Sequence, residues 1–249
     1  VRKLSYRSEP LHHVPQWGGR ELLAFGVPLG AFALLCLGAT LISGYNGAFK
    51  ALYFDGPSPM QFFWLALSRM GEGGVLAPVI ILLFMLRAPH TTVWVLLAMI
   101  LAGVAAQLLK HNVFWYLERP AGFFDFNPEH YPGLFGMPPT RRAFPSGHAS
   151  SLMAAVLALA WLWRGEWKTL LSLSLLLVIL SYARIGAWAH YPADLLGGWG
   201  VGLLAVLVVY PFRRNLAPYI EGLMDNDLLV RFIRALALLV LLVTLFFGG

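Results

Sequence analysis

The chain has 249 residues, of which 59% are hydrophobic and 12% are charged. Soluble domains carry about 25% charged residues, so this composition excludes an ordinary soluble domain and indicates an integral membrane protein. The net charge of +6 does not predict a nucleic-acid partner, because the basic residues are spread between apolar segments. The single cysteine, Cys36, excludes a disulfide framework and a cysteine-based metal site.

Apolar runs of about membrane length recur along the chain. A spanning helix takes roughly 20 mostly apolar residues, and the runs predict an all-α bundle of six transmembrane helices that forms a single membrane domain over residues 1–249. The predicted spans are Leu22–Ile42, Gly74–Leu86, Thr92–Leu109, His148–Trp163, Leu170–Ile185 and Ala193–Tyr210. The second is short, and residues 60–74 are expected to extend it or to form an interfacial turn, because the glycines at positions 71, 73 and 74 allow a bend.

An additional apolar run at residues 228–247 closes the chain. Two arginines near its start leave two interpretations open: a further span, which we favour, or an amphipathic helix on the membrane surface. Earlier in the chain, Gly26-x-x-x-Gly30 and Gly198-x-x-x-Gly202 have the spacing that lets helices cross closely. We expect these pairs to pack helices within one molecule, and the sequence does not indicate an oligomeric state.

Lysine and arginine in the short loops indicate the orientation of the bundle. The basic residues of the N-terminal tail (residues 1–21) and of the connections after the second, fourth and sixth spans fall on one side, which we expect to be the cytoplasm. The other side holds the long loop at residues 112–145 and the short corner at 187–192. We therefore expect a protein of the bacterial inner membrane with this second face toward the periplasm.

Ionisable residues collect at the span ends on the expected periplasmic face. In chain order they are Lys110, Arg119, His148, Arg184, His190 and Asp194. An ionisable residue at membrane depth costs roughly 2.5–3.5 kcal/mol on insertion scales, so such residues indicate function. A single histidine at a membrane interface is more often structural, and a single arginine near a helix end usually anchors lipid headgroups. The functional interpretation therefore depends on the group as a whole.

The fourth predicted span begins with Pro-Ser-Gly-His at residues 145–148. A helix N-terminus has unpaired N–H groups and a partial positive charge, which together bind anions. Ser146 can cap the helix and donate a hydrogen bond, and Gly147 lets an anion approach the backbone closely. With the side chains of Lys110, Arg119 and Arg184 on the same face, the pattern predicts a phosphate cradle.

The sixth predicted span is preceded by a second histidine. Pro192 fits the first turn of a helix, which places His190 just before the helix and Asp194 within its first turn. Asp194 can then accept a hydrogen bond from one imidazole nitrogen and leave the other as a nucleophile. Two histidines beside a phosphate cradle allow one to attack phosphorus while the other protonates the leaving oxygen.

These motifs, in this order, closely resemble the signature of the type-2 phosphatidic acid phosphatase superfamily, which includes bacterial acid phosphatases, glucose-6-phosphatase and vanadium haloperoxidases. The signature has Lys, six residues and Arg-Pro; then Pro-Ser-Gly-His; then Ser-Arg, five residues, His, three residues and Asp. Residues 145–148 match its second part, and Arg184, His190 and Asp194 match its third. The matching motifs cover residues 110–194.

The chain departs from this signature at two places. Eight residues rather than six separate Lys110 from Arg119, and Asn112 stands where the family spacing would place the lysine. We favour Lys110 as the phosphate ligand, with two extra residues bulging in the loop. Ala183 precedes Arg184 where the family usually has serine. The neighbouring residues at 181 and 182, a serine and a tyrosine, are the candidates to compensate for the missing hydrogen bond.

The resemblance implies a role for each matching residue. His190 would form a phosphohistidine, Asp194 would orient it, and His148 would protonate the leaving group and then activate water. The phosphoryl oxygens would be bound by Lys110, Arg119, Ser146, Gly147 and Arg184. The resemblance also implies that no metal ion or other cofactor is needed.

The leading hypothesis is a metal-independent lipid phosphate phosphatase, since the multispan body favours a lipid over a soluble ester. Candidate substrates are phosphatidate, phosphatidylglycerol phosphate, prenyl diphosphates and lipid A phosphates. Two alternatives stay open: a phosphotransferase that uses the same histidine, and a phospholipid-binding or transport protein without turnover. Loop aromatics are expected to form either an interfacial wall for lipid chains or a packed lid; they are Phe114, Trp115, Phe123, Phe124 and Phe126.

Overall fold

The computed structural model describes residues 17–54, 56–124, 139–162 and 166–247. Most of the predicted N-terminal tail and the middle of the predicted periplasmic loop, including Phe126, lie outside the described residues. The described chain folds into helices, which confirms the predicted all-α membrane bundle. In chain order the helices are α1 Gly19–Leu52, α2 Ser58–Met70, α3 Gly73–Phe84, α4 Pro89–Asn112, α5 Pro120–Phe123, α6 Gly147–Leu162, α7 Trp167–Gly186, α8 Pro192–Val209, η3 Tyr210–Phe212, α9 Arg213–Met224 and α10 Asp227–Phe247.

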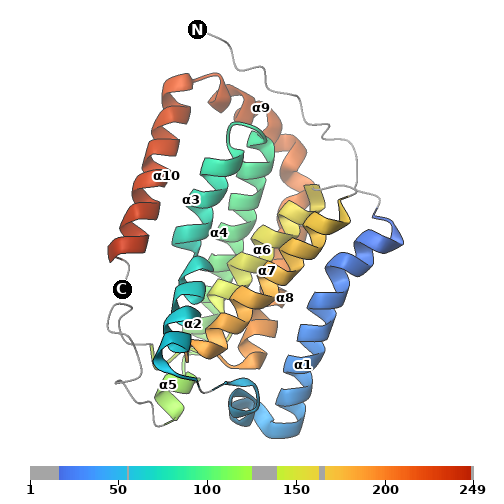
Figure 1. The fold of residues 1–249 in the computed structure, drawn as a ribbon. Coiled ribbons are helices and arrows are strands. Elements are labelled where there is room, and N and C mark those ends of the chain that lie inside the picture. Colours follow the sequence, from blue (N-terminus) through green and yellow to red (C-terminus); the bar gives the residue numbers. More distant parts are fainter. Residues whose placement is uncertain (1–16, 55, 125–138, 163–165, 248–249) are drawn as a thin grey trace.

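Each predicted span corresponds to a helix of the bundle. Helices α1, α4, α7, α8 with the adjoining η3, and α10 are long and apolar enough to cross a membrane, and α6 is a shorter apolar helix. Helices α2 and α3 are together long and apolar enough for a broken span or a re-entrant loop, and they meet at a bend of 59°. The bend predicted from the glycines at 71, 73 and 74 is confirmed. Helix α10 packs along α3 and runs beside it in the same bundle (Figure 1).

Several helix ends and the loops that join them lie together at the lower end of the bundle (Figure 1). This end holds the last turns of α1 and α4, helix α5, the first turn of α6 and the corner between α7 and α8. Helix α9 lies at the opposite end. All of the predicted site residues therefore meet at the same end, because each belongs to one of the helix ends or loops gathered there.

Close contact between α6 and α8 fixes the position of the Pro-Ser-Gly-His motif at the start of α6 relative to Asp194 in α8. A Cβ atom at Gly198 or Gly202 would overlap the backbone oxygens of Ser146 and Ser150, so only glycine allows this helix crossing. The crossing also lets the Ser146 backbone N–H donate to the Asp194 backbone oxygen at 2.9 Å. By contrast, Gly26 and Gly30 face open space within the described structure, so the prediction of a close crossing holds for only one of the two pairs.

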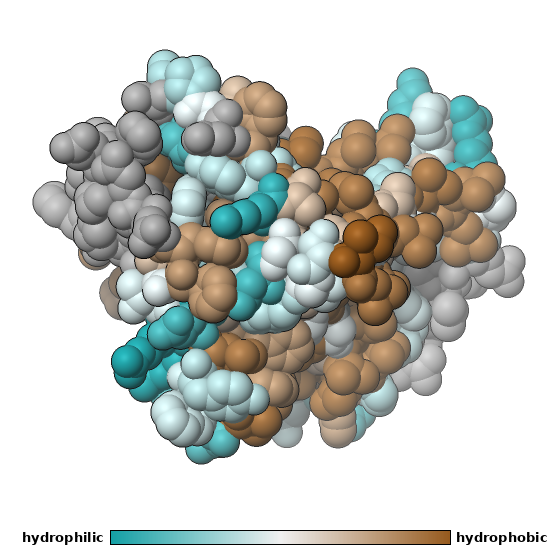
Figure 2. Space-filling view, turned by 90° about the horizontal axis from the view of Figure 1, so that it is seen from below, coloured by the Kyte–Doolittle hydropathy of each residue, from teal (hydrophilic) through white to brown (hydrophobic). Residues whose placement is uncertain are grey.

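The outer surface of the bundle is largely apolar. Large side chains such as Ile42 of α1, Leu204 of α8 and Phe246 of α10 are exposed, as expected for a surface that contacts hydrocarbon. Figure 2 shows the end of the molecule that carries the predicted site residues. Hydrophilic side chains reach the middle of this face, while hydrophobic side chains gather beside them. The polar site thus lies next to lipid-facing surface.

Candidate active site

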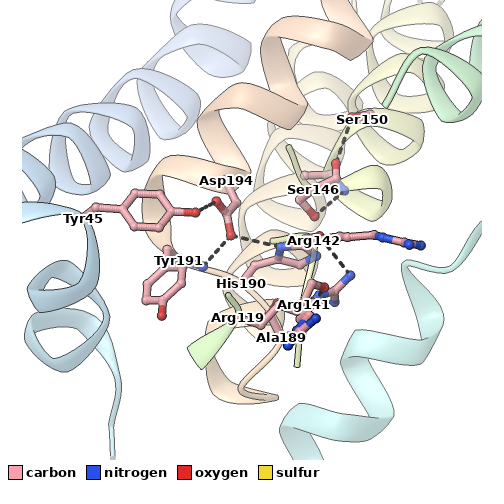
Figure 3. Close-up of polar contacts among 11 residues, drawn as sticks. Tyr45, Arg119, Arg141, Arg142, Ser146, Ser150, Ala189, His190, Tyr191 and Asp194 are labelled. Carbon is pink, nitrogen blue, oxygen red and sulfur yellow. Dashed lines mark hydrogen bonds and ion pairs between the residues drawn. The ribbon is translucent and has the colours of Figure 1, made fainter. Parts of the chain in front are cut away.

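His190 and Asp194 form a buried pair at the corner between α7 and α8 (Figure 3). The backbone N–H groups of Ala189 and His190 donate to the Arg184 oxygen at 3.0 and 3.2 Å, which ends α7 and sets the corner. The His190 Nδ1 atom lies 3.1 Å from Asp194 Oδ2, and both side chains are completely buried. Asp194 Oδ2 also accepts from the Tyr191 backbone N–H at 2.9 Å. This geometry agrees with the contact expected from the sequence.

The second nitrogen of His190 has the properties of a nucleophile. With Nδ1 directed at the carboxylate, Nε2 carries the lone pair, and it has no hydrogen-bond partner in the described part of the chain. Burial, together with the nearby charges of Arg119 and Lys110, holds the pKa of His190 well below its ordinary value. The imidazole is therefore neutral at neutral pH, which is the form that can attack phosphorus.

The N-terminus of α6 lies beside this pair, since the Ser146 backbone N–H donates to the Asp194 backbone oxygen at 2.9 Å. The Ser146 side-chain oxygen accepts from the Ala149 backbone N–H at 3.3 Å, so Ser146 caps the helix as expected. The backbone of Gly147 has no side chain over it, and a Cβ atom added there would have Ala106 Cβ as its nearest neighbour, at 3.9 Å. An anion can therefore approach these N–H groups closely.

Arg119 is held in place by backbone oxygens. Its Nε atom donates to the Arg141 oxygen at 2.9 Å, and its two terminal nitrogens donate to the Ala189 oxygen at 3.4 Å and the Arg142 oxygen at 3.5 Å. These contacts tie the loop before α6 to the corner that carries His190. Because its acceptors are neutral carbonyl groups, the guanidinium keeps its full positive charge for an anion.

Lys110 lies in the last turn of α4 and is buried, and it lines the same cavity as Arg119. Asn112 is exposed, and its side-chain amide donates to the Leu108 backbone oxygen at 2.8 Å. The structure therefore brings Lys110, and not Asn112, into the group of site residues. In the turn that follows α4, the backbone N–H groups of Val113 and Phe114 both donate to the Leu109 oxygen, at 3.0 and 2.9 Å.

The two hydroxyls that the sequence offers as compensation for Ala183 have partners on other helices. The Ser181 hydroxyl accepts from Trp199 Nε1 at 3.0 Å, and the Tyr182 hydroxyl donates to the Leu52 backbone oxygen at 2.8 Å. Both are therefore committed to packing between helices. A hydroxyl that contacts the Arg184 guanidinium belongs to Ser68 of α2, which is 116 positions away along the chain.

A cavity of about 650 Å³ adjoins the cradle. Its polar wall includes Lys110, Arg119, Gly147 and His148, while part of its apolar wall comes from α4 through Ile100, Val104 and Leu108. These three apolar side chains are also exposed on the outer surface of the bundle. The cavity thus connects the phosphate cradle to surface that faces lipid.

The aromatic loop residues fall into two groups. Phe114 packs edge-on against Phe144, and Phe124 stacks on Phe49. Trp115 and Phe123 are instead half or more exposed, at 60% and 50%. The packed lid expected from the sequence therefore describes Phe114 and Phe124, and the interfacial wall describes Trp115 and Phe123.

Comparison with known proteins places the chain in a family. The family model described as PAP2 superfamily matches residues 91–218. The chain belongs to the PAP2 superfamily. The matched range contains every residue predicted for the site, from Lys110 to Asp194. Together with the undecaprenyl-diphosphatase relative described next, the family confirms the predicted enzyme class, a phosphatase.

Two relatives of this PAP2 protein are informative. It is 27% identical over 178 residues to the undecaprenyl-diphosphatase of Sulfolobus acidocaldarius, a match that covers 69% of this chain and 82% of the relative. Its fold is similar to the crystal structure of Aquifex aeolicus LpxE, with a TM-score of 0.51 and 23% identity over 74% of this chain and 95% of that one. The structural likeness supports the fold of the bundle.

Tyr45 is a site residue that the sequence did not reveal. Its hydroxyl donates to Asp194 Oδ1 at 2.5 Å, so both oxygens of this buried carboxylate are engaged (Figure 3). Gly44, with φ of 73°, breaks the regular path of α1 immediately before it and turns Tyr45 toward α8. A glycine before a tyrosine in an apolar helix can signal a kink, but no sequence pattern pairs Tyr45 with a residue 149 positions later.

We expect Tyr45→Phe to lower turnover by roughly tenfold, because a hydrogen bond to a charged group is worth about 1.5–3 kcal/mol and this one orients Asp194. Phosphate release from a lipid substrate measures the effect. Tyr182→Phe is the matched control, since it also removes a hydroxyl hydrogen bond between helices but does not touch Asp194. An equal loss in both variants would mean that the Tyr45 hydroxyl only supports the fold.

Proposed function

We propose that this PAP2 protein is a metal-independent lipid phosphate phosphatase that works through a phosphohistidine at His190. The observation that carries the proposal is the buried, neutral imidazole whose Nδ1 is bound to Asp194 and whose Nε2 is unpaired in the described structure. The adjoining cradle supplies the positive charge of Lys110 and Arg119 for the phosphoryl oxygens.

The proposed reaction has two steps. In the first, Nε2 of His190 attacks the terminal phosphorus and the P–O bond to the leaving group breaks. This bond is an ester bond in a phosphomonoester and an anhydride bond in a diphosphate. His148 gives its proton to the leaving oxygen. In the second, His148 takes a proton from water, the resulting hydroxide attacks phosphorus, and the P–N bond breaks to return the electron pair to Nε2. Inorganic phosphate leaves, and His148 is again protonated for the next cycle.

The cavity supports a lipid as the substrate. Its polar end can hold a phosphate at the cradle, while its apolar α4 wall is continuous with the outer surface where a hydrocarbon chain would lie. The relative named undecaprenyl-diphosphatase makes a polyprenyl diphosphate the first substrate to test. Phosphatidate, phosphatidylglycerol phosphate and lipid A phosphates are the other candidates.

We also propose that the site faces the periplasm from the inner membrane. The support is the charge distribution, since Arg20, Arg87 and Lys168 stand at the bundle end opposite the site. Basic residues of short loops favour the cytoplasmic side, which leaves the site on the other side of the membrane.

The test is phosphate release by the purified protein in detergent micelles, with each of the four lipid classes, in excess EDTA. We expect release from at least one lipid, no loss with EDTA, and inhibition by vanadate, which mimics phosphate at such a cradle. The matched control is His190→Asn, which should be inactive. Full sensitivity to EDTA, or unchanged activity of the variant, would contradict the mechanism.

The same assay separates the alternatives. Loss of substrate without free phosphate, accompanied by phosphorylation of an added acceptor lipid, would identify a phosphotransferase. Tight binding of lipid phosphates with no turnover of any of them would identify a binding or transport protein.

A further inference from the structure

The break between α2 and α3 carries an acidic residue, Glu72, in a largely apolar segment whose other charged residue is Arg69, at the end of α2. The cations that face Glu72 are Arg69 and, from α7, Arg184. The Glu72 backbone is fixed there: the N–H donates to the Arg69 oxygen at 2.9 Å, and the carbonyl accepts from Val75 and Leu76 at 2.9 and 2.8 Å. Glu72 occupies the N-cap position of α3, but its side chain makes no capping hydrogen bond. An ionisable side chain in such a segment indicates a function other than capping.

The carboxylate of Glu72 is directed at His148. Its Oε1 atom lies 3.7 Å from His148 Nε2, and the two side chains are 31% and 30% exposed. This separation is too long for a strong hydrogen bond but is within ion-pair range when the imidazole is protonated. The buried His190–Asp194 contact is shorter, at 3.1 Å, and completely enclosed. The His190–Asp194 contact thus suits a histidine with a fixed tautomer. The Glu72–His148 contact suits a histidine that gains and loses a proton.

The other charges that face His148 disfavour its protonated form. They are Arg184 at the end of α7 and Lys110 at the end of α4, and the imidazole of His190 also lies nearby. A general acid needs a proton before the leaving group departs. Glu72 supplies the negative charge that offsets these cations at His148.

We propose that Glu72 is a positioning residue for His148: its carboxylate pairs with the protonated imidazole, holds it at the cavity and favours the state that protonates the leaving oxygen. This inference rests on the proposed function. The bend at 71–74 then has a chemical purpose, because the same segment brings Ser68 to Arg184, Glu72 to His148 and Gly73 to the cavity wall.

The experiment compares Glu72→Gln with the wild type on two substrates, p-nitrophenyl phosphate and dioctanoyl phosphatidate. The first releases a stable phenolate that needs little protonation, whereas the second releases an alkoxide that needs a proton. We expect E72Q to lose roughly tenfold in turnover of the phosphatidate and clearly less with p-nitrophenyl phosphate. The alkaline limb of its pH–rate profile should move to lower pH, because His148 loses its counter-charge. Glu72→Asp should restore part of both effects.

The control is Glu118→Gln, which removes one negative charge from an exposed residue on the same face and should leave the rate and the profile unchanged. An equal loss on both substrates with an unshifted profile, or no loss at all, overturns the proposal for Glu72. Size-exclusion chromatography shows whether E72Q is folded, and if it is not, E72D alone must show the substrate-dependent loss. A wild type that releases phosphate from no substrate overturns the proposed function and this inference together.

Discussion

Replacement of His190 by asparagine is expected to lower phosphate release by roughly 10⁴-fold or more, as for other nucleophiles of covalent catalysis. The asparagine amide can still donate to Asp194 from about the place of Nδ1, so the buried carboxylate keeps a partner. What the variant lacks is the Nε2 lone pair, which is unpaired in the described structure. The loss should therefore fall on chemistry and leave the fold intact.

Rapid quenching with ³²P-labelled substrate measures this prediction directly. Wild-type protein should carry an acid-labile phosphoryl group, and His190→Asn should carry none. Circular dichroism and thermal unfolding of the two proteins provide the control for folding. A variant that still forms the labelled species would show that another residue is the nucleophile.

The protonation state of His190 also follows from its surroundings. Its pKa lies below the ordinary value because burial and the neighbouring cations disfavour the imidazolium. A group with a lowered pKa stays deprotonated as the pH falls to its ordinary titration range, so His190 remains nucleophilic at mildly acidic pH. An alkaline limb in the rate profile therefore belongs to a group that must be protonated. In the proposed mechanism these groups are His148, which donates the proton, and Lys110, whose ammonium binds the phosphoryl oxygens.

Residues within short motifs could be predicted from the sequence because their geometry is local. The Pro-Ser-Gly-His start of α6 requires only a helix N-terminus, and the contact between His190 and Asp194 requires only one helical turn. The spans could be predicted from hydropathy for a similar reason, since each buries its backbone hydrogen bonds within itself. The position of Lys110 is harder to predict, because its spacing to Arg119 is two residues longer than in the family signature.

Contacts between distant helices could not be predicted in the same way. Tyr45, Ser68 and Glu72 each touch a site residue that is more than 70 positions away. Their placement depends on the kink at Gly44 and on the 59° bend between α2 and α3. A glycine pattern can predict that a helix bends, but the direction of the bend depends on packing against α7 and α8. For this reason, the contact of Ser68 with Arg184 could not be predicted from the residues next to Arg184 in the sequence.

Replacement of His148 by alanine should slow complete turnover by roughly 10²- to 10⁴-fold, the usual contribution of a general acid–base group. The effect differs in kind from the loss of His190, because His148 acts in both steps while Nε2 of His190 remains able to attack. With p-nitrophenyl phosphate, whose leaving group needs little protonation, the first step should survive and the second should become limiting. The labelled phosphohistidine should then accumulate in His148→Ala to a higher level than in the wild type.

Added imidazole provides a sharper form of the same experiment. His148 lines the cavity of about 650 Å³ and its side chain is 30% exposed, so removal of the ring leaves space that a free imidazole can enter. We expect imidazole to speed hydrolysis of the accumulated phosphoenzyme in His148→Ala and to have no effect on His190→Asn, which forms no such species. Accumulation without rescue would still place His148 in the second step. A variant that neither accumulates phosphoenzyme nor loses turnover would remove His148 from the mechanism, and with it the role inferred for Glu72.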